Sequence, residues 1–289
     1  MTEVLSIRQP ESTFHPGAIP TPVCPDDLGS LESTGAGLTC CNCHRHFPSS
    51  NAITELLPRE VSCEASHESQ QLDAYQASFS KRPDRAWKQP LRVLLHRMGN
   101  GYLHSWAAST LEKLAKGRSL TLLDAGCGDG VLKSYLRGRH TYVGADSSIR
   151  PLLRAQHYNP ALYFRADLGH LPFSDNSFDV VFLLQALQYH ARPRMALAQI
   201  ARILRPRGSL LLTVPNDESF KYQFEGTPKI QLQRFTRRNL PALLTEHFDS
   251  VQAQPRGIWV PVPFLSLHAP GAYTARWGLS WTVIATPRK

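Results

Sequence analysis

The chain has 289 residues, of which 42% are hydrophobic and 19% are charged, and its formal net charge is +9. This composition excludes a disordered chain, and no uninterrupted apolar run approaches the roughly 20 residues of a membrane-spanning helix. The first residues lack a basic stretch followed by an apolar one, so we expect a cytoplasmic protein.

The N-terminal part combines a polar tail with a cluster of cysteines. We expect residues 1–19 to be a disordered tail and residues 20–60 to form a small β module. Five of the six cysteines precede residue 64, and in the cytosol such clustering favours metal binding over disulfides. The spacing is C-x2-D followed by C-x2-C, made by Cys24, Asp27, Cys40 and Cys43. This pattern resembles a short zinc ribbon with aspartate as its second ligand, which implies a structural zinc ion.

Other residues of the same region are rival zinc ligands, namely Cys41, His44, His46 and Cys63. A ribbon that keeps its hairpin fold without metal is a further alternative, because zinc needs about four ligands and only three ribbon cysteines are present. In either form we expect a structural role for the module.

A polar stretch follows the module, and we expect residues 61–86 to be a linker. Within it, Tyr75 and Phe79 are one helical turn apart and could dock on a neighbouring domain. We expect residues 87–289 to form one α/β domain, which opens with two helices over 90–117 split at Asn100–Gly101.

The segment LLDAGCGDG, residues 122–130, predicts a buried strand that ends at Asp124 and runs into a glycine-rich turn. Residues 131–137 have helical spacing, so a helix is expected next. A strand, a Gly-x-Gly turn and a helix predict a nucleotide site at the carboxyl edge of a parallel sheet. The glycine spacing differs from the NAD fingerprint, and an acid before the first glycine disfavours a pyrophosphate. A ligand with cationic groups, such as S-adenosylmethionine, fits better.

The next apolar runs continue this pattern. Tyr142 and Val143 precede Asp146, which follows Asp124 at the distance expected for an acid that binds ribose hydroxyls. A third run ends at Asp167–Leu168, where a carboxylate can accept a hydrogen bond from an adenine amino group. A buried strand over 180–184, an amphipathic helix over 195–204 and a fifth strand over 209–216 follow.

The order DAGCGDG, GADSS, ADLGHLPFSDNSFDVV and AQIARILRPRG resembles the class I S-adenosylmethionine-dependent methyltransferases. It is most similar to their quinone-biosynthesis-type and other small-molecule branch, over roughly residues 119–216. The resemblance implies an α/β, Rossmann-like sheet of seven strands with the last strand antiparallel. It also implies that S-adenosylmethionine is the methyl donor and S-adenosylhomocysteine the product.

Carried over by position, the resemblance implies a set of donor-binding residues. These are Asp124, Gly126 and Gly128 for the methionine end, Asp146 and Ser147 for the ribose, Asp167 and Leu168 for the adenine, Gln185 as a residue closing over the donor, and Tyr75 as an N-terminal aromatic cover.

The acceptor side is expected to lie after the fourth strand and beside a late insertion. Tyr189 and His190 are the candidate general bases, and Tyr189 occupies the position where the family often has histidine. Residues 255–280, rich in proline, glycine and aromatics, predict a long irregular loop that shapes substrate access.

These residues favour methyl transfer to an oxygen, nitrogen or carbon atom of a small apolar or aromatic metabolite. Arginine groups at 192–194, 202–207 and 234–238 leave an rRNA or tRNA base methyltransferase as the alternative, although no aromatic-interleaved RNA motif accompanies them. A donor-binding subunit without catalysis is the third interpretation.

Overall fold

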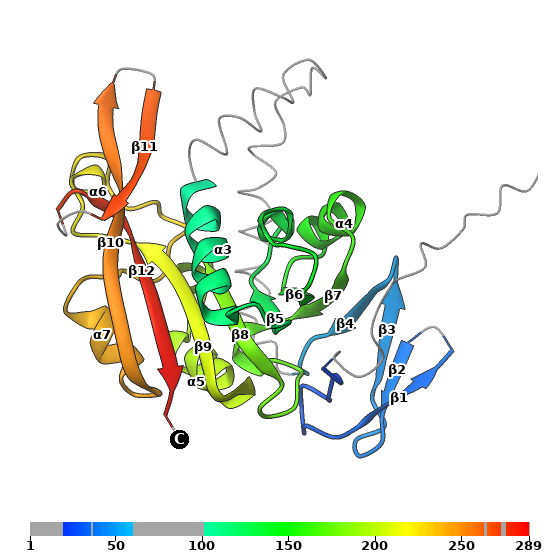
Figure 1. The fold of residues 1–289 in the computed structure, drawn as a ribbon. Helices are drawn as coiled ribbons and strands as arrows, with labels where there is room; N and C mark the ends of the chain where they lie inside the picture. The colour runs from blue at the N-terminus through cyan, green and yellow to red at the C-terminus, as the bar shows by residue number, and fades with distance from the viewer. Residues whose placement is uncertain (1–19, 36, 60–100, 263–264, 273–275, 289) are drawn as a thin grey trace, which may run out of the picture.

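The computed structural model describes residues 20–35, 37–59, 101–262, 265–272 and 276–288 (Figure 1). The expected tail, the linker with Tyr75 and Phe79, and the rival ligand Cys63 lie outside these ranges.

One mixed sheet runs through the described residues. Its twelve strands are ordered β1-β2-β3-β4-β7-β6-β5-β8-β9-β12-β10-β11, a count that includes the four strands β1 to β4 of the N-terminal module. The central strands are β7 (Leu162–Ala166), β6 (Thr141–Asp146), β5 (Thr121–Ala125), β8 (Phe178–Leu184) and β9 (Leu204–Pro215). These five are parallel, whereas β12 (Gly278–Pro287) runs antiparallel to both β9 and β10 (Phe248–Val262).

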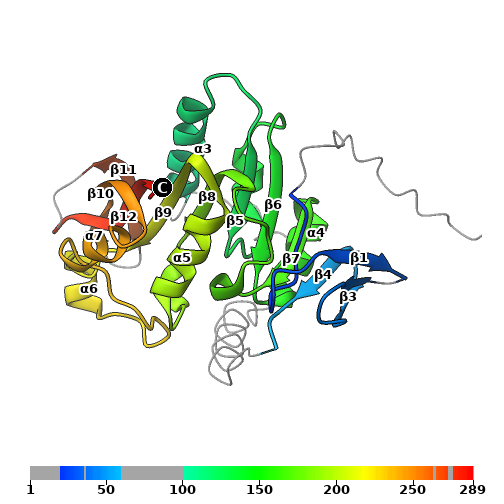
Figure 2. The same cartoon turned by 90° about the horizontal axis from the view of Figure 1, so that it is seen from below.

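Helices cover both faces of the central strands, because alternate residues of a strand point to opposite faces. Leu122 of β5 packs in a core with Leu111 of α3 (Gly101–Ala115), whereas the next residue, Leu123, packs in a core with Ile200 of α5 (Pro193–Ile203). The helix α4 (Ile149–Tyr158) covers β6 and β7, and α7 (Asn239–Leu244) shares the core of α5. Figure 2 shows α3 and α5 on opposite sides of the sheet.

The N-terminal strands form an antiparallel meander, β1 (Leu31–Thr34), β2 (Gly37–Cys40), β3 (His46–Ser50) and β4 (Ile53–Leu56). Its last strand, β4, pairs in parallel with β7 over four residues. A second connection precedes the meander, where Pro22 bridges Phe173 and Val23 N donates to Pro172 O at 2.9 Å. The module therefore extends the main sheet at its β7 edge.

Two local expectations are wrong. The glycine turn opens only a five-residue 3-10 helix, η2 (Val131–Tyr135), because Leu136 takes an extended conformation and ends it. The expected irregular loop over 255–280 is largely strand, since β10 continues to Val262 and pairs with an additional strand, β11 (Leu265–Ala272).

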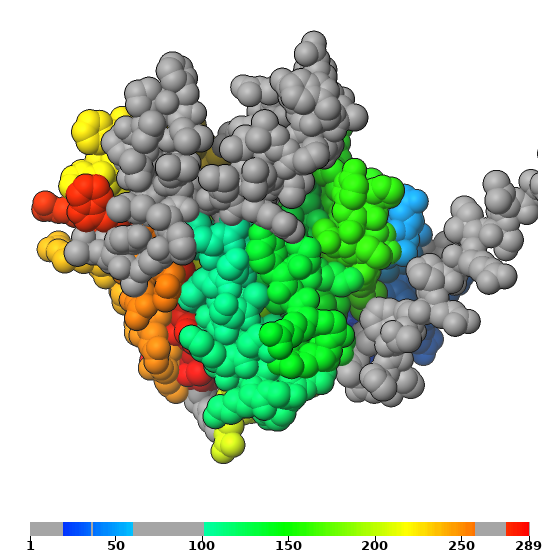
Figure 3. All heavy atoms as spheres, turned by 45° about the horizontal axis from the view of Figure 1, so that its top comes forward, coloured from blue at the N-terminus to red at the C-terminus, as the bar shows by residue number. Residues whose placement is uncertain are grey.

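In the space-filling view of Figure 3, the surface of α3 lies between β10 and the residues that follow β5.

Three further short helices occur in the described residues. The helix α6 (Phe220–Glu225) lies between β9 and β10, and η3 (Leu168–His170) and η4 (Leu187–Tyr189) follow β7 and β8. Both 3-10 helices begin at the carboxyl edge of the parallel strands, where open α/β sheets bind their ligands.

Candidate functional site

Three carboxylates gather at the carboxyl edge of three adjacent strands. Asp124 lies near the end of β5, Asp146 ends β6, and Asp167 follows β7. The strands pair in register, with Asp124 beside Gly144 and Asp146 beside Arg165. The sheet therefore brings the three predicted acidic residues to one edge.

The glycine turn contacts Ala145 of β6 on one side and Ala186 on the other. Gly126 has φ +72°, and its N–H donates to Ala145 O at 2.7 Å. A Cβ on Gly126 would lie 2.4 Å from the Cβ of Ala186. Only glycine meets both conditions, because a side chain here is strained and also collides with Ala186. Gly128 has φ +51°, and a Cβ there would enter open space.

Asp146 ties this turn to the end of β6. Its Oδ2 accepts from Gly128 N at 2.9 Å, and its Oδ1 accepts from Ser148 N at 2.9 Å. A carboxylate oxygen can accept more than one hydrogen bond, so a ribose hydroxyl can share these oxygens. The predicted ribose acid therefore also holds the backbone of the predicted methionine loop.

Asp124 is almost completely buried, and Tyr142 of β6 donates its hydroxyl to Asp124 Oδ2 at 2.6 Å. Burial raises the pKa of Asp124 to about 7, opposed by the Tyr142 hydrogen bond and reinforced by the charge of Asp146. The carboxyl is thus poised to ionise near neutral pH when a cationic group approaches.

The two carboxylate oxygens of Asp167 differ in their hydrogen-bond partners. Its Oδ2 accepts from Gly169 N at 2.9 Å and lies 2.9 Å from His170 Nδ1. Its Oδ1 lies 3.6 Å from Nε2 of His190, a side chain that is 10% exposed. His190 Nδ1 accepts from Arg192 N at 3.1 Å, and burial is the main cause that lowers the pKa of His190.

The structure turns Gln185 away from the glycine turn. Its φ is +54°, and its amide Nε2 lies 3.3 Å from Thr213 Oγ1 and 3.4 Å from Ser280 Oγ. The amide therefore points to β9 and β12, and Ala186 is the residue against Gly126.

Three other predicted residues lie near the same edge. Tyr189 is half-buried in η4, and Leu168 is half-buried in η3. The Ser147 carbonyl accepts from Arg165 Nε at 2.9 Å.

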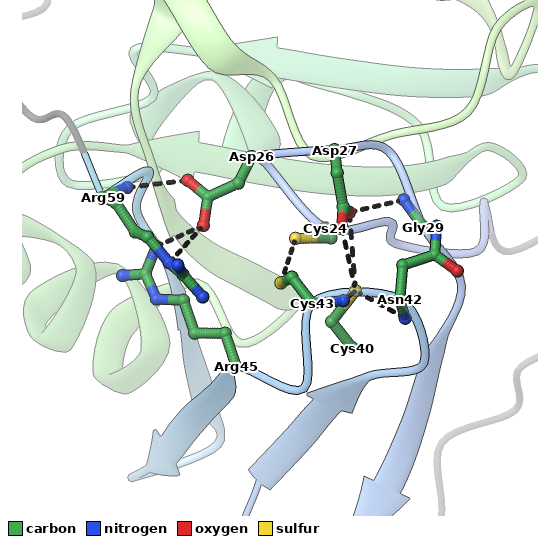
Figure 4. Close-up of polar contacts among 9 residues, drawn as sticks. All are labelled: Cys24, Asp26, Asp27, Gly29, Cys40, Asn42, Cys43, Arg45 and Arg59. Atoms are coloured by element: carbon green, nitrogen blue, oxygen red, sulfur yellow. Dashed lines mark hydrogen bonds and ion pairs between the residues drawn. The ribbon is translucent and has the colours of Figure 1, made fainter.

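The four predicted zinc ligands meet in one cluster (Figure 4). One ligand atom each from Cys24, Asp27, Cys40 and Cys43 lies within 4.8 Å of all the others. The sulfurs of Cys24 and Cys43 are 3.7 Å apart, and Cys40 Sγ lies 3.4 Å from Asp27 Oδ1. Zinc–sulfur bonds of about 2.3 Å at tetrahedral angles separate two sulfurs by about 3.8 Å. The spacing of these donor atoms fits a tetrahedral zinc ion.

Backbone amides support the same cluster. Asn42 N and Cys43 N both donate to Cys40 Sγ at 3.4 Å, and Gly29 N donates to Asp27 Oδ1 at 2.9 Å. Such bonds orient metal ligands and favour a thiolate. The rival residues Cys41, His44 and His46 are exposed and do not belong to the cluster.

Sequence reasoning missed the residues that join this cluster to the carboxylate edge. Glu55 of β4 pairs with Arg165 of β7 at 2.7 Å, and Cys24 and Cys40 share a core with Phe164 and Phe173. The charged Arg165 inside the otherwise apolar run LYFRA was the available signal. Tyr142 and Ala186 gave no comparable signal, because their partners Asp124 and Gly126 lie far away in the chain. His170 gave none either, although its partner Asp167 is three residues away.

Residues 123–212 match a family model described as a methyltransferase domain. The chain is 34% identical over 113 residues to the malonyl-[acyl-carrier protein] O-methyltransferase of Erwinia pyrifoliae, a match that covers 38% of this chain and 43% of the relative. It is 37% identical over 124 residues to phthiotriol/phenolphthiotriol dimycocerosates methyltransferase 1 of Mycobacterium ulcerans, covering 39% and 45% respectively. The chain thus spans less than half the length of these curated relatives.

A solved structure from Thermotoga maritima shares the fold. It is described as an S-adenosylmethionine-dependent methyltransferase and possible histamine N-methyltransferase. It superposes with a TM-score of 0.52 at 18% identity, over 76% of this chain and 98% of that one. Across the part of the chain that the structure describes, no helix is long and apolar enough to cross a membrane.

Proposed function

We propose that this chain, whose residues 123–212 form a class I S-adenosylmethionine-dependent methyltransferase domain, transfers a methyl group to a small-molecule acceptor. The observation that carries this proposal is the arrangement of Asp124, Asp146 and Asp167 around the glycine turn at one sheet edge. Three acids at one edge suit a donor with cationic groups rather than a pyrophosphate, because like charges repel.

Different residues of this edge are proposed to bind different parts of the donor. Asp124, Gly126 and Gly128 are proposed to hold the methionine end, Asp146 and Ser147 the ribose, and Asp167 and Leu168 the adenine. The open space beside Gly128 supports this assignment, because backbone can approach a ligand closely there. Tyr75 remains a proposed cover of the donor, whereas the Gln185 amide bonds to Thr213 of β9 and Ser280 of β12.

The bound donor supplies a methyl group already activated on a sulfonium. The protein has to align the acceptor in line with that methyl group and exclude water, which lowers the barrier by orientation. Of the two residues expected to remove a proton from the acceptor, Tyr189 keeps that proposed role. His190 faces Asp167 on the donor side.

The ion pairs made by the arginine groups favour a small acceptor over RNA. Four of these arginines pair with acids, in the ion pairs Arg194–Glu246, Arg202–Asp175, Arg205–Asp179 and Arg237–Glu218. Arginines neutralised in this way contribute less to phosphate binding. The two relatives are named for a malonyl-[acyl-carrier protein] and for phthiotriol/phenolphthiotriol dimycocerosates, neither of which is a nucleic acid.

The N-terminal module is proposed to be a zinc-ribbon-like structural unit. Cys24, Asp27, Cys40 and Cys43 would hold the ion, and two of these cysteines already belong to the core beside β7. Zinc there would fix the packing of the module on the sheet, since structural zinc sites stabilise small folds directly.

The test is label transfer from methyl-labelled S-adenosylmethionine to small-molecule, RNA and protein fractions. Label in a small organic product, lost in Asp146→Ala and kept in the surface control Asp249→Ala, is the expected result. Label in RNA alone would overturn the small-molecule assignment. Donor binding without label in any fraction would favour a non-catalytic, donor-binding subunit.

A further inference from the structure

We infer that His190 is a positioning residue that prepares Asp167 to select a purine with an exocyclic amino group. This inference rests on the proposed function, in which Asp167 accepts a hydrogen bond from the adenine of the donor. It assigns to His190 a role in donor specificity in place of a general base at the acceptor.

The hydrogen bond from the Arg192 backbone determines which ring nitrogen of His190 carries the proton. Arg192 N donates to His190 Nδ1 at 3.1 Å, so Nδ1 must be unprotonated. In the neutral ring the proton is then on Nε2. That nitrogen is buried and has no hydrogen-bond partner among the residues that the structure describes.

The Nε2–H of His190 is directed at the adenine-binding residue. It lies 3.6 Å from Asp167 Oδ1, slightly beyond hydrogen-bond length. Gly169 leaves room for the Asp167 carboxyl beside this ring, because a Cβ at 169 would lie only 2.9 Å from Asp167 Oδ2. A buried donor without a partner costs free energy, so a small shift that completes its bond to Oδ1 is favourable.

The two oxygens of Asp167 then have different tasks. Gly169 N and His170 Nδ1 both contact Oδ2. Of these three groups, only His190 Nε2 lies near Oδ1. Oδ1 is therefore the oxygen available to an incoming amino group. A bond from the His190 N–H to Oδ1 would fix the orientation of the carboxylate and leave Oδ1 a further lone pair for that amino group.

A carboxylate oxygen accepts from a 6-amino group and repels a 6-carbonyl oxygen. Without the His190 N–H, the carboxylate of Asp167 loses a group that orients Oδ1, so this oxygen is less well placed to accept from the 6-amino group. The structure thus predicts that His190 contributes to the preference for adenosyl over inosyl donors. A site built to bond one polar group discriminates strongly against an analogue that lacks it.

The experiment compares the dissociation constants of S-adenosylhomocysteine and its deaminated analogue S-inosylhomocysteine by titration calorimetry. His190→Asn keeps an acceptor for Arg192 N but removes the donor that faces Asp167, whereas His190→Gln retains an N–H at nearly the same reach. We expect the wild-type preference for the adenosyl ligand to fall about tenfold in His190→Asn, and to persist in His190→Gln. The exposed His157→Gln is the matched control and should leave the preference unchanged.

A wild-type protein that binds both ligands equally, or a His190→Asn variant that keeps the full preference, would overturn the inference. Failure of the wild type to bind either ligand would instead overturn the proposed function on which it rests. Because two conservative variants with opposite expectations are compared, loss of folding in one of them can be recognised from its thermal transition.

Discussion

Glu55 and Arg165 are register partners on the parallel strands β4 and β7, and their side chains form an ion pair at 2.7 Å. The same guanidinium donates from Nε to the carbonyl of Ser147, the residue after the predicted ribose acid. Arg165 thus connects the cysteine module to the donor edge through one side chain.

We expect Glu55→Gln to weaken donor binding about two- to fivefold with little loss of stability. The pair is partly exposed, and such pairs contribute about 1 kcal/mol or less to folding. Its effect on the Ser147 loop should be visible in the dissociation constant of S-adenosylhomocysteine. Glu32→Gln, on the exposed strand β1, is the control, and an equal change in both variants would contradict the connection.

Metal removal should destabilise the module and loosen the loop that follows β7. The module contacts this loop on both sides, through the β4–β7 pairing before it and through Val23 at Pro172 after it. We expect a chelator to lower the melting temperature by several degrees and to weaken donor binding. Bound zinc, measured by atomic emission, should be lost in Cys40→Ser and retained in the exposed Cys41→Ser.

Ionisation of the buried Asp124 should lower the stability of the fold and strengthen donor binding. Its pKa rises from 3.8 to about 7 on folding, so the folded state binds the extra proton between these values. Wild-type stability therefore falls as pH rises from about 4 to about 7, because the unfolded chain releases this proton in that range whereas the native state still holds it. Asp124→Asn removes this loss, and its stability relative to wild type should rise over the same range by up to about 4 kcal/mol.

Donor binding supplies the contrasting measurement for Asp124. In the wild type, affinity for S-adenosylmethionine should increase as pH rises through about 7, because the ionised carboxylate attracts the cationic end of the donor. Asp124→Asn should bind more weakly and lose this pH dependence. A variant that binds as the wild type does at every pH would remove Asp124 from the site.

Gly126→Ala should disrupt the turn for two separable reasons. A Cβ at φ +72° costs about 1–2 kcal/mol, and it would also lie 2.4 Å from the Ala186 Cβ. We expect a lower melting temperature and donor binding too weak to measure. Adding Ala186→Gly should restore part of the stability, because it removes the collision but leaves the strained conformation. No recovery in the double variant would mean that the contact with Ala186 is unimportant.

Local patterns in the sequence predicted much of the carboxylate edge. Asp124, Asp146 and Asp167 each end or follow a continuous apolar run, and parallel strands must present such residues at the same edge. The C-x2-D and C-x2-C spacing likewise named the four residues that cluster, because each pair lies within one tight turn. Their proposed ligands and zinc remain predictions.

The sequence by itself determined which short segments form strands and which acids and cysteines lie at their ends, since periodicity and spacing are local properties. Only the tertiary structure decided that β4 joins the main sheet, that Gln185 turns towards β9 and β12, and that His190 faces Asp167. These contacts join residues far apart in the chain. They depend on strand order and on packing across the sheet edge, which local sequence periodicity does not encode.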